Sequence, residues 1–147
     1  MSDSDPHDLS RFVEAQDRGV YERAVAELRA GAKRSHWMWF VFPQLRGLGR
    51  SPTAQRYAIA DAQEARAYLA HPVLGPRLRE ATHAILSVRE RDATAILGRP
   101  DDAKLRSCLT LFLAAADDEA DRALFRAGLA RFYAGRPDPA TLDLLGA

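Results

Sequence analysis

The sequence contains a single cysteine, Cys108, among its 147 residues. One thiol excludes a disulfide within the chain and argues against a structural zinc site, which needs several cysteine or histidine ligands. The four histidines, His7, His36, His71 and His83, have no recognisable ligand spacing. We therefore expect no metal ion or other cofactor, and we expect Cys108 to be a small buried hydrophobic residue.

Long apolar runs are also absent. Even the apolar run at residues 37–42 ends after six residues, at Pro43, whereas a helix needs roughly 20 to span a bilayer. No apolar segment near the N-terminus resembles a signal peptide. These absences predict a cytoplasmic protein with no membrane partner.

Net charge is nearly absent too, because 21 basic residues face 20 acidic ones and the formal charge is +1. Domains that bind nucleic acid usually have a pI above about 9, so no nucleic-acid partner is expected. The charges are unevenly placed, however. Residues 28–60 contain six basic residues and no Asp or Glu, namely Arg29, Lys33, Arg34, Arg46, Arg50 and Arg56. This acid-free stretch is consistent with an anionic partner and equally with chance in an arginine-rich composition.

The pattern of apolar residues predicts an all-α fold. Apolar residues recur at helical spacing between Gly, Pro and Asp residues, and no segment alternates as a strand does. With 47% hydrophobic residues the chain can bury one core. We expect a single compact domain of about seven to nine helices over residues 8–147, with no significant sheet, after a flexible tail at residues 1–7.

Capping residues predict where several helices begin. Asp8 is expected to cap the first helix, and Asp92 and Asp117 later ones. Asp61 and Glu64 have the spacing of a capping box. The apolar run at residues 36–42 fits either a buried strand or a short helix. A short helix is favoured, because Ser35 is a good N-cap and Pro43 a good stop.

The segment at residues 33–44 is the leading candidate for a site. It contains both tryptophans of the chain, directly after two cations and a hydroxyl. Free N–H groups at a helix start can bind an anion, the cations add charge, an indole offers a stacking face, and His36 can exchange a proton near neutral pH. The alternative is that the tryptophans are core and Ser35 merely caps. The ligand-binding candidates here are Lys33, Arg34, Ser35, His36, Trp37, Trp39 and Gln44.

Three further residues are expected at the edge of this site. Arg46 lies in a glycine-containing loop, and Lys104 and Ser107 share one face of a predicted helix. For acid/base chemistry the candidates are His36, Glu64 and Asp101. Each carboxylate also has a structural explanation at a helix start, which needs no substrate.

The same residues carry a resemblance to a known family. The motif Ser35-His36-Trp37-Met38-Trp39-Phe40-Val41-Phe42-Pro43-Gln44-Leu45, the later Gly47-Leu48-Gly49, His71-Pro72-Val73-Leu74-Gly75 and Thr110-Leu111-Phe112 resemble the domain of unknown function 1810 family over nearly the whole chain. The resemblance implies a compact, mainly helical bacterial protein and brings no established activity.

Three functions remain open from the sequence. The first is binding of an anionic, nucleotide-like or phosphorylated small molecule at the basic and aromatic segment. The second is a hydrolase or transferase that acts on such a ligand, for example an ADP-ribose or NAD derivative. The third is a non-catalytic protein-interaction domain, which predicts an exposed apolar patch and no pocket. The sequence leaves the oligomeric state open.

Overall fold

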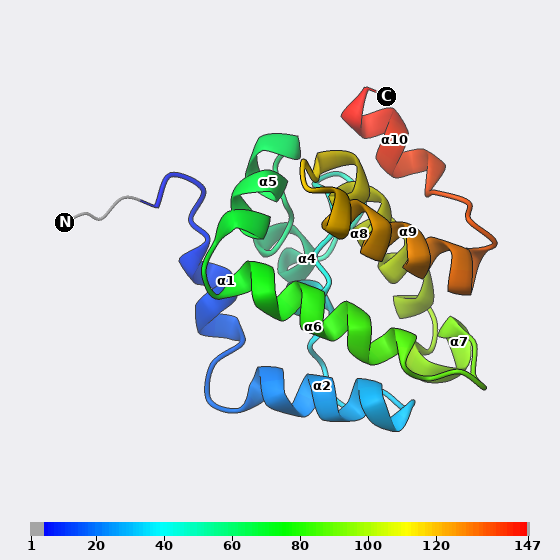
Figure 1. Cartoon of the computed structure of the whole chain (residues 1–147). Helices are drawn as coiled ribbons and strands as arrows, with labels where there is room; N and C mark the ends of the chain where they lie inside the picture. Colours follow the sequence, from blue (N-terminus) through cyan, green and yellow to red (C-terminus); the bar gives the residue numbers. More distant parts are fainter. Residues whose placement is uncertain (1–4, 147) are drawn as a thin grey trace.

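A computed structural model describes residues 5–146 and confirms the all-α fold in a single compact domain (Figure 1). Ten helices and no strand are present in this part of the chain, one helix more than the upper end of the expected range. No helix in it is long and apolar enough to cross a bilayer. The helices are α1 (Ser10–Ala15), α2 (Val20–Ala30), α3 (Met38–Val41), α4 (Pro52–Arg56), α5 (Ala62–Ala70), α6 (Leu74–Leu86), α7 (Ala93–Leu97), α8 (Asp101–Ala115), α9 (Glu119–Tyr133) and α10 (Pro139–Leu145).

Aspartate caps begin several of these helices as expected. Asp61 accepts a hydrogen bond from the N–H of Glu64 at the start of α5, and Asp92 accepts one from Ala95 at the start of α7. The cap of α9 is Asp118 and not the predicted Asp117, since the Asp118 carboxylate accepts the N–H of the residue three positions on. These caps satisfy N–H groups that a helix start otherwise leaves without partners.

Helix α1 begins differently from the prediction. Asp8 does not cap it, because the helix starts at Ser10 and its N-cap position, Leu9, makes no side-chain cap bond. Asp5 takes this role from further back, accepting hydrogen bonds from the N–H groups of Leu9 and Ser10 at 2.8 and 3.0 Å. Of the expected tail, residues 1–4 lie outside the described part of the chain.

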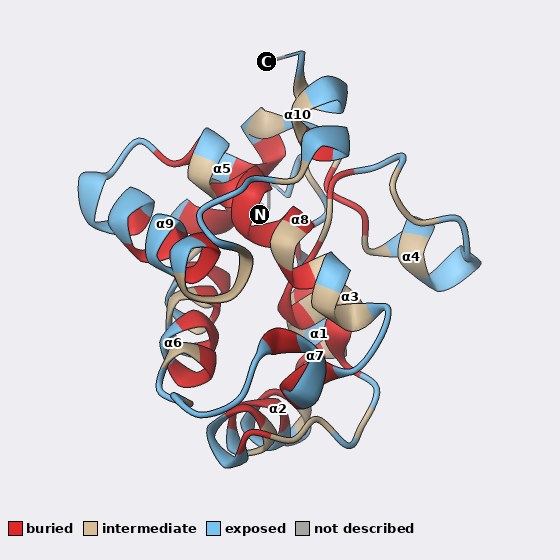
Figure 2. Cartoon of the chain, turned by 90° about the vertical axis from the view of Figure 1, so that its right-hand side faces the viewer, coloured by how far each residue is buried: buried red, intermediate tan, exposed pale blue. Residues whose placement is uncertain are grey.

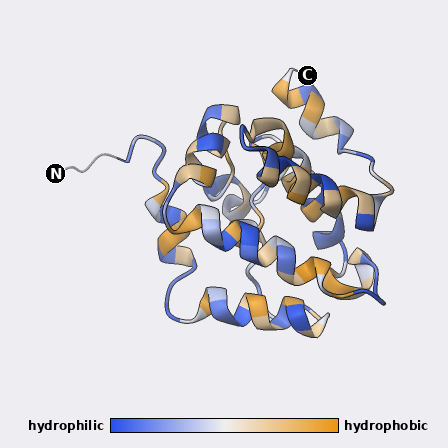
Figure 3. Ribbon diagram, in the orientation of Figure 1, coloured by the Kyte–Doolittle hydropathy of each residue, from blue (hydrophilic) through white to orange (hydrophobic). Residues whose placement is uncertain are grey.

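Helix α8 lies at the centre of the fold. It packs against α5, α7, α9 and α10, and much of its ribbon is buried in Figure 2. Aromatic rings on three helices meet across it: the ring centroid of Phe112 lies 5.3 Å from that of Tyr68 and 6.0 Å from that of Phe125. Burial of such rings supplies much of a core's stability. Helices α2 and α6 run side by side at the edge of this core, with hydrophobic and hydrophilic residues alternating along them (Figure 3).

One isolated bridge links two irregular segments. The N–H of Arg46 donates to the carbonyl of Ile59 at 2.7 Å, and the N–H of Ile59 donates to the carbonyl of Gln44 at 2.8 Å. Leu45 and Ile59 are both buried at this point. The bridge therefore fixes the segment after α3 against the segment after α4. Helix α4 itself, between them, has no buried residue and stands out from the body in Figure 2.

Candidate functional site

The predicted basic and aromatic segment is organised around Glu27, a residue of α2 that the sequence did not single out. The Glu27 Oε1 atom accepts hydrogen bonds from the N–H groups of Arg34 and Ser35 at 2.9 and 3.0 Å and from the indole of Trp37 at 2.8 Å. Its Oε2 atom accepts the Ser35 hydroxyl at 2.6 Å. The donors that were expected to hold an external anion thus hold a carboxylate of the protein itself.

These four hydrogen bonds fix the ionisation of Glu27. Burial by itself raises the pKa of this carboxyl, but the hydrogen bonds from the Ser35 hydroxyl, the Arg34 N–H, the Trp37 indole and the Ser35 N–H outweigh burial and lower the pKa to about 2.

Ser35 is not the N-cap of α3, contrary to the prediction, because its hydroxyl donates to Glu27. That helix starts at Met38, with Trp37 at its N-cap position and no side-chain cap bond.

The two tryptophans lie in different surroundings. Trp37 is 1% exposed and belongs to the core, where its ring centroid lies 6.4 Å from that of Phe42. Trp39 is only partly buried, and the ammonium group of Lys104 lies 5.3 Å from its ring centroid. Of the two indoles, only that of Trp39 retains a face near the surface.

Asp101 is held between two lysines. Its carboxylate lies 3.0 Å from the ammonium nitrogen of Lys33 and 3.5 Å from that of Lys104, and all three side chains are largely buried. The Lys33 ammonium also lies 5.3 Å from the ring centroid of Trp37. Both predicted cations are therefore engaged with this carboxylate, which has the structural role that was left open for it.

Gln44, Lys104 and Ser107 do come together. They line one cavity of about 360 Å³, the Lys104 cavity, with Leu48, Gly49, Pro100, Ala103, Asp138 and Ala140. The Ser107 hydroxyl donates to the Asp138 carboxylate at 3.1 Å, which also caps α10. His36 and Arg34 are exposed, and no side-chain hydrogen-bond partner of either is present within residues 5–146.

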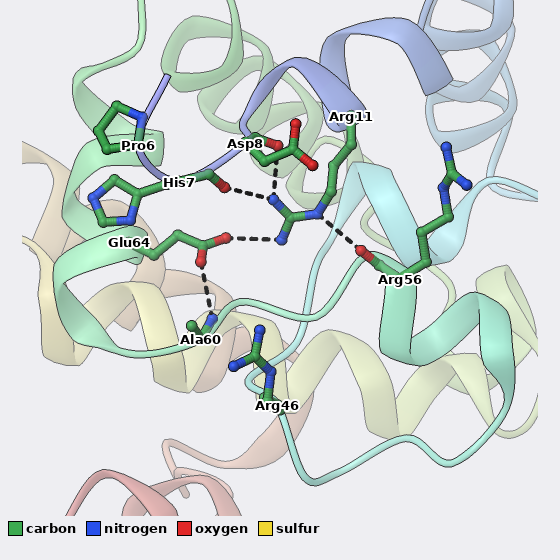
Figure 4. A pocket seen from close by; sticks show the side chains of 8 residues that line it. All are labelled: Pro6, His7, Asp8, Arg11, Arg46, Arg56, Ala60 and Glu64. Atoms are coloured by element: carbon green, nitrogen blue, oxygen red, sulfur yellow. Dashed lines mark hydrogen bonds and ion pairs between the residues drawn. The ribbon is translucent and has the colours of Figure 1, made fainter. Parts of the chain in front are cut away.

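Arg46 lines a second, larger hollow, which we call the arginine cavity. It has a volume of about 580 Å³ and combines three arginines with a histidine and two carboxylates (Figure 4). Its walls come from the segment before α1, from α1 itself, from the loop after α3, from the end of α4, from the α4–α5 connection and from α5. The lining residues are Pro6, His7, Asp8, Arg11, Arg46, Arg56, Ala60 and Glu64.

Arg11 lines this cavity, but all its side-chain donors are engaged by other groups of the protein. All five N–H groups of a guanidinium are donors, and those of Arg11 make five hydrogen bonds. One goes to the Glu64 carboxylate at 2.9 Å, in a pair whose side chains are 11% and 5% exposed. The others go to backbone carbonyls of His7, Asp8, Arg56 and Ala58.

Glu64 has both carboxylate oxygens engaged. Oε2 accepts from Arg11, and Oε1 accepts the N–H of Ala60 at 3.2 Å. The expected capping box is therefore modified: Asp61 caps Glu64 as predicted, but Glu64 reaches back to Ala60 and not to Asp61. Because this carboxylate is buried and accepts a hydrogen bond at each oxygen, it holds the wall of the cavity in place.

Arg46 and Arg56 differ from Arg11. Within residues 5–146, neither guanidinium has a carboxylate within ion-pair distance or a hydrogen-bond acceptor, and in Figure 4 both stand clear of the Arg11 network. Both side chains are exposed, and the Arg56 guanidinium lies 5.6 Å from the ring centroid of Tyr57. Two positive groups thus border a cavity whose third arginine is already neutralised by Glu64.

Sequence reasoning placed Arg46 among the candidates but missed His7, Arg11 and Arg56 as cavity residues. The acid-free stretch was the available signal for Arg56. Two other cations of that stretch form ion pairs with carboxylates distant along the chain. The Arg29 guanidinium lies 3.6 Å from the Glu80 carboxylate, and Lys33 pairs with Asp101. No group of three or more His, Cys, Asp or Glu side chains that could hold a metal ion occurs in residues 5–146.

The fold and the cavity define a small, single-domain helical protein with a basic hollow at its surface. The chain belongs to the family described as "Protein of unknown function (DUF1810)", whose model matches residues 6–145. It is similar to a solved structure, the conserved hypothetical protein Rv1873 from Mycobacterium tuberculosis, with 55% sequence identity, a TM-score of 0.92, and coverage of 97% of this chain and 99% of that one. No curated protein matches the chain.

Proposed function

We propose that the protein binds a phosphate-bearing or similarly anionic small molecule in the arginine cavity. The observation that carries the proposal is the placement of Arg46 and Arg56 beside a cavity of about 580 Å³ with no carboxylate partner for either in residues 5–146. Guanidinium groups bind phosphate and carboxylate oxygens through charged, often paired hydrogen bonds. This ligand class is the one predicted from the sequence. The proposed site, however, is the arginine cavity and not the basic and aromatic segment at residues 33–44.

The charges around the cavity support this choice. Arg11 and Glu64 neutralise each other, and the two remaining arginines, Arg46 and Arg56, outnumber the one remaining carboxylate, Asp8. His7 adds an imidazole ring, whose N–H can donate a hydrogen bond to an anion. At the tryptophan segment, by contrast, Glu27 already occupies the N–H donors and Asp101 engages both lysines.

Binding is favoured over catalysis by the residues proposed for acid/base chemistry. Glu64 is buried with both oxygens bonded, and Asp101 is paired with two lysines. His36 lines neither the arginine cavity nor the Lys104 cavity. None of the three groups proposed from the sequence for acid/base chemistry is therefore free beside a ligand in the arginine cavity.

The test is titration of the protein with inorganic phosphate and pyrophosphate, with the backbone NMR chemical shifts measured at each step. The shifts are expected to cluster at residues 7, 46, 56 and 60. Arg46→Gln and Arg56→Gln should each weaken binding by about tenfold, because each removes a charged hydrogen-bond donor. Arg50→Gln is the matched control, since Arg50 is exposed in the same acid-free stretch but does not line the arginine cavity.

Two results would overturn the proposal. One is the absence of localised shifts at millimolar phosphate and pyrophosphate. The other is an Arg46→Gln/Arg56→Gln double variant that binds as tightly as the Arg50→Gln control while its folded spectrum is retained.

A further inference from the structure

The arginine cavity has an apolar neighbour. A second cavity of about 380 Å³ shares Arg46 and Ala60 with it, so the two hollows adjoin along these residues. We call this second hollow the leucine cavity, because three leucines line it. Its lining residues are Leu45, Arg46, Ala60, Asp61, Ala62, Gln63, Leu144 and Leu145.

Leu144 is the unusual residue of this cavity. It is 52% exposed, and no other large hydrophobic residue in residues 5–146 is exposed to such a degree. It lies on α10, at the C-terminal end of the described chain, and its Cδ1 atom would lie 3.3 Å from a Cβ atom built on Gly47. The leucine thus sits directly against the loop that carries Arg46. Because Leu144 also lines the leucine cavity, a ligand bound there would cover apolar surface that is now exposed to water.

We infer that the ligand is an organic anion with two parts, its anionic group at Arg46 and Arg56 and a neutral apolar group in the leucine cavity against Leu144. This inference rests on the proposed function and extends it to the rest of the ligand. Arg46 lies at the junction of the two hollows, so one molecule can contact the guanidinium and the leucines together.

The polar groups of the leucine cavity restrict the apolar part further. Asp61 is exposed at its wall and carries a carboxylate of which one oxygen accepts the N–H of Glu64. In this cavity a second negative group would be repelled by that carboxylate, and a positive group by Arg46, which lines the same cavity. The leucine cavity therefore selects a neutral ring or short hydrocarbon, such as the phenyl group of an aryl phosphate monoester.

Phenyl phosphate and inorganic phosphate form the probe pair. Isothermal titration of the full chain should give about tenfold tighter binding of phenyl phosphate, because the ring covers apolar surface that phosphate leaves in water. Leu144→Ala should remove most of that difference and leave the affinity for inorganic phosphate unchanged. Leu142→Ala is the matched control, since it makes the same change on α10 at a residue that does not line the cavity.

The outcomes separate this inference from the proposed function. Equal affinities for the two probes, both weakened by Arg46→Gln, would overturn the apolar part and leave the anion site in place. Retention of the phenyl preference in Leu144→Ala would also overturn it. Failure of both probes to bind would overturn the proposed function itself. Circular dichroism of the two leucine variants checks that α10 remains folded.

Discussion

At the scale of single residues, two carboxylates of the protein itself bind donor groups of the basic and aromatic segment. Glu27 takes up the N–H groups of Arg34 and Ser35, and Asp101 takes up the ammonium groups of Lys33 and Lys104. Of the six cations in residues 28–60, Arg29 pairs with Glu80 and Lys33 with Asp101, both distant along the chain. Local charge counting therefore found the region but could not separate these two paired cations from Arg46 and Arg56, which line the arginine cavity.

Replacement of Glu27 tests its role as the internal anion. Glu27→Gln should lower the free energy of unfolding by about 1–3 kcal/mol, because hydrogen bonds to a charged acceptor are lost and the new amide N–H groups face existing donors. Urea unfolding followed by circular dichroism measures the loss. Glu22→Gln, an exposed glutamate on the same helix, should change stability by less than about 0.5 kcal/mol.

The same residue predicts a pH dependence. The pKa of Glu27 is about 2 in the folded protein against an ordinary value of 4.5, so its ionised form stabilises the fold. That contribution is complete above about pH 4.5 and is lost as the pH falls towards 2, where the folded protein also takes up the proton. The stability difference between the wild type and Glu27→Gln should therefore shrink between pH 5 and pH 2. A difference that stays constant over this range would contradict the assignment.

At the scale of elements, the sequence predicted where helices occur, but it predicted the first residue of only some of them. Local signals are sufficient where a side chain bonds to its own helix, as for Asp61 and Asp92. Ser35 fails as a predicted cap because its hydroxyl goes to Glu27, eight positions earlier and on another helix. A tertiary contact of this kind leaves no local pattern, so the sequence predicted a helix in the right place with the wrong start.

The junction of α5 and α6 depends on Gly75. A Cβ atom at this position would lie 2.1 Å from the carbonyl oxygen of Leu69, a backbone atom that cannot move aside as a flexible side chain can. Gly75→Ala should therefore destabilise the protein by about 3 kcal/mol or prevent folding. Gly135→Ala provides the contrast, because Gly135 has a positive φ of 76° but open space around it, so only backbone strain of about 1 kcal/mol is expected. Thermal unfolding of the two variants compares them, and equal losses would contradict the clash.

At the scale of the whole molecule, the fold followed from the sequence and the arginine cavity did not. Periodicity and composition predict helices and one core, since both are properties of the chain read in order. The cavity instead depends on the Leu45–Ile59 bridge, which brings Arg46 beside the α4–α5 connection. Arg11 then closes its wall by binding carbonyls more than 40 positions away. Such long-range contacts have no signature in a single sequence.

Cys108 offers a probe of how cooperatively the whole molecule unfolds. The residue is fully buried on α8, and burial raises its pKa well above the ordinary thiol value, as expected for a small core residue. Because α8 packs against four other helices, a thiol reagent should reach Cys108 only when the entire domain opens. The labelling rate should then rise with urea with the same slope as the equilibrium unfolding free energy. An Ala114→Cys/Cys108→Ala variant, with its thiol at an exposed position of the same helix, should react at once and independently of urea. A shallow urea dependence for Cys108 would mean that α8 is exposed by local opening, and the single cooperative core would have to be abandoned.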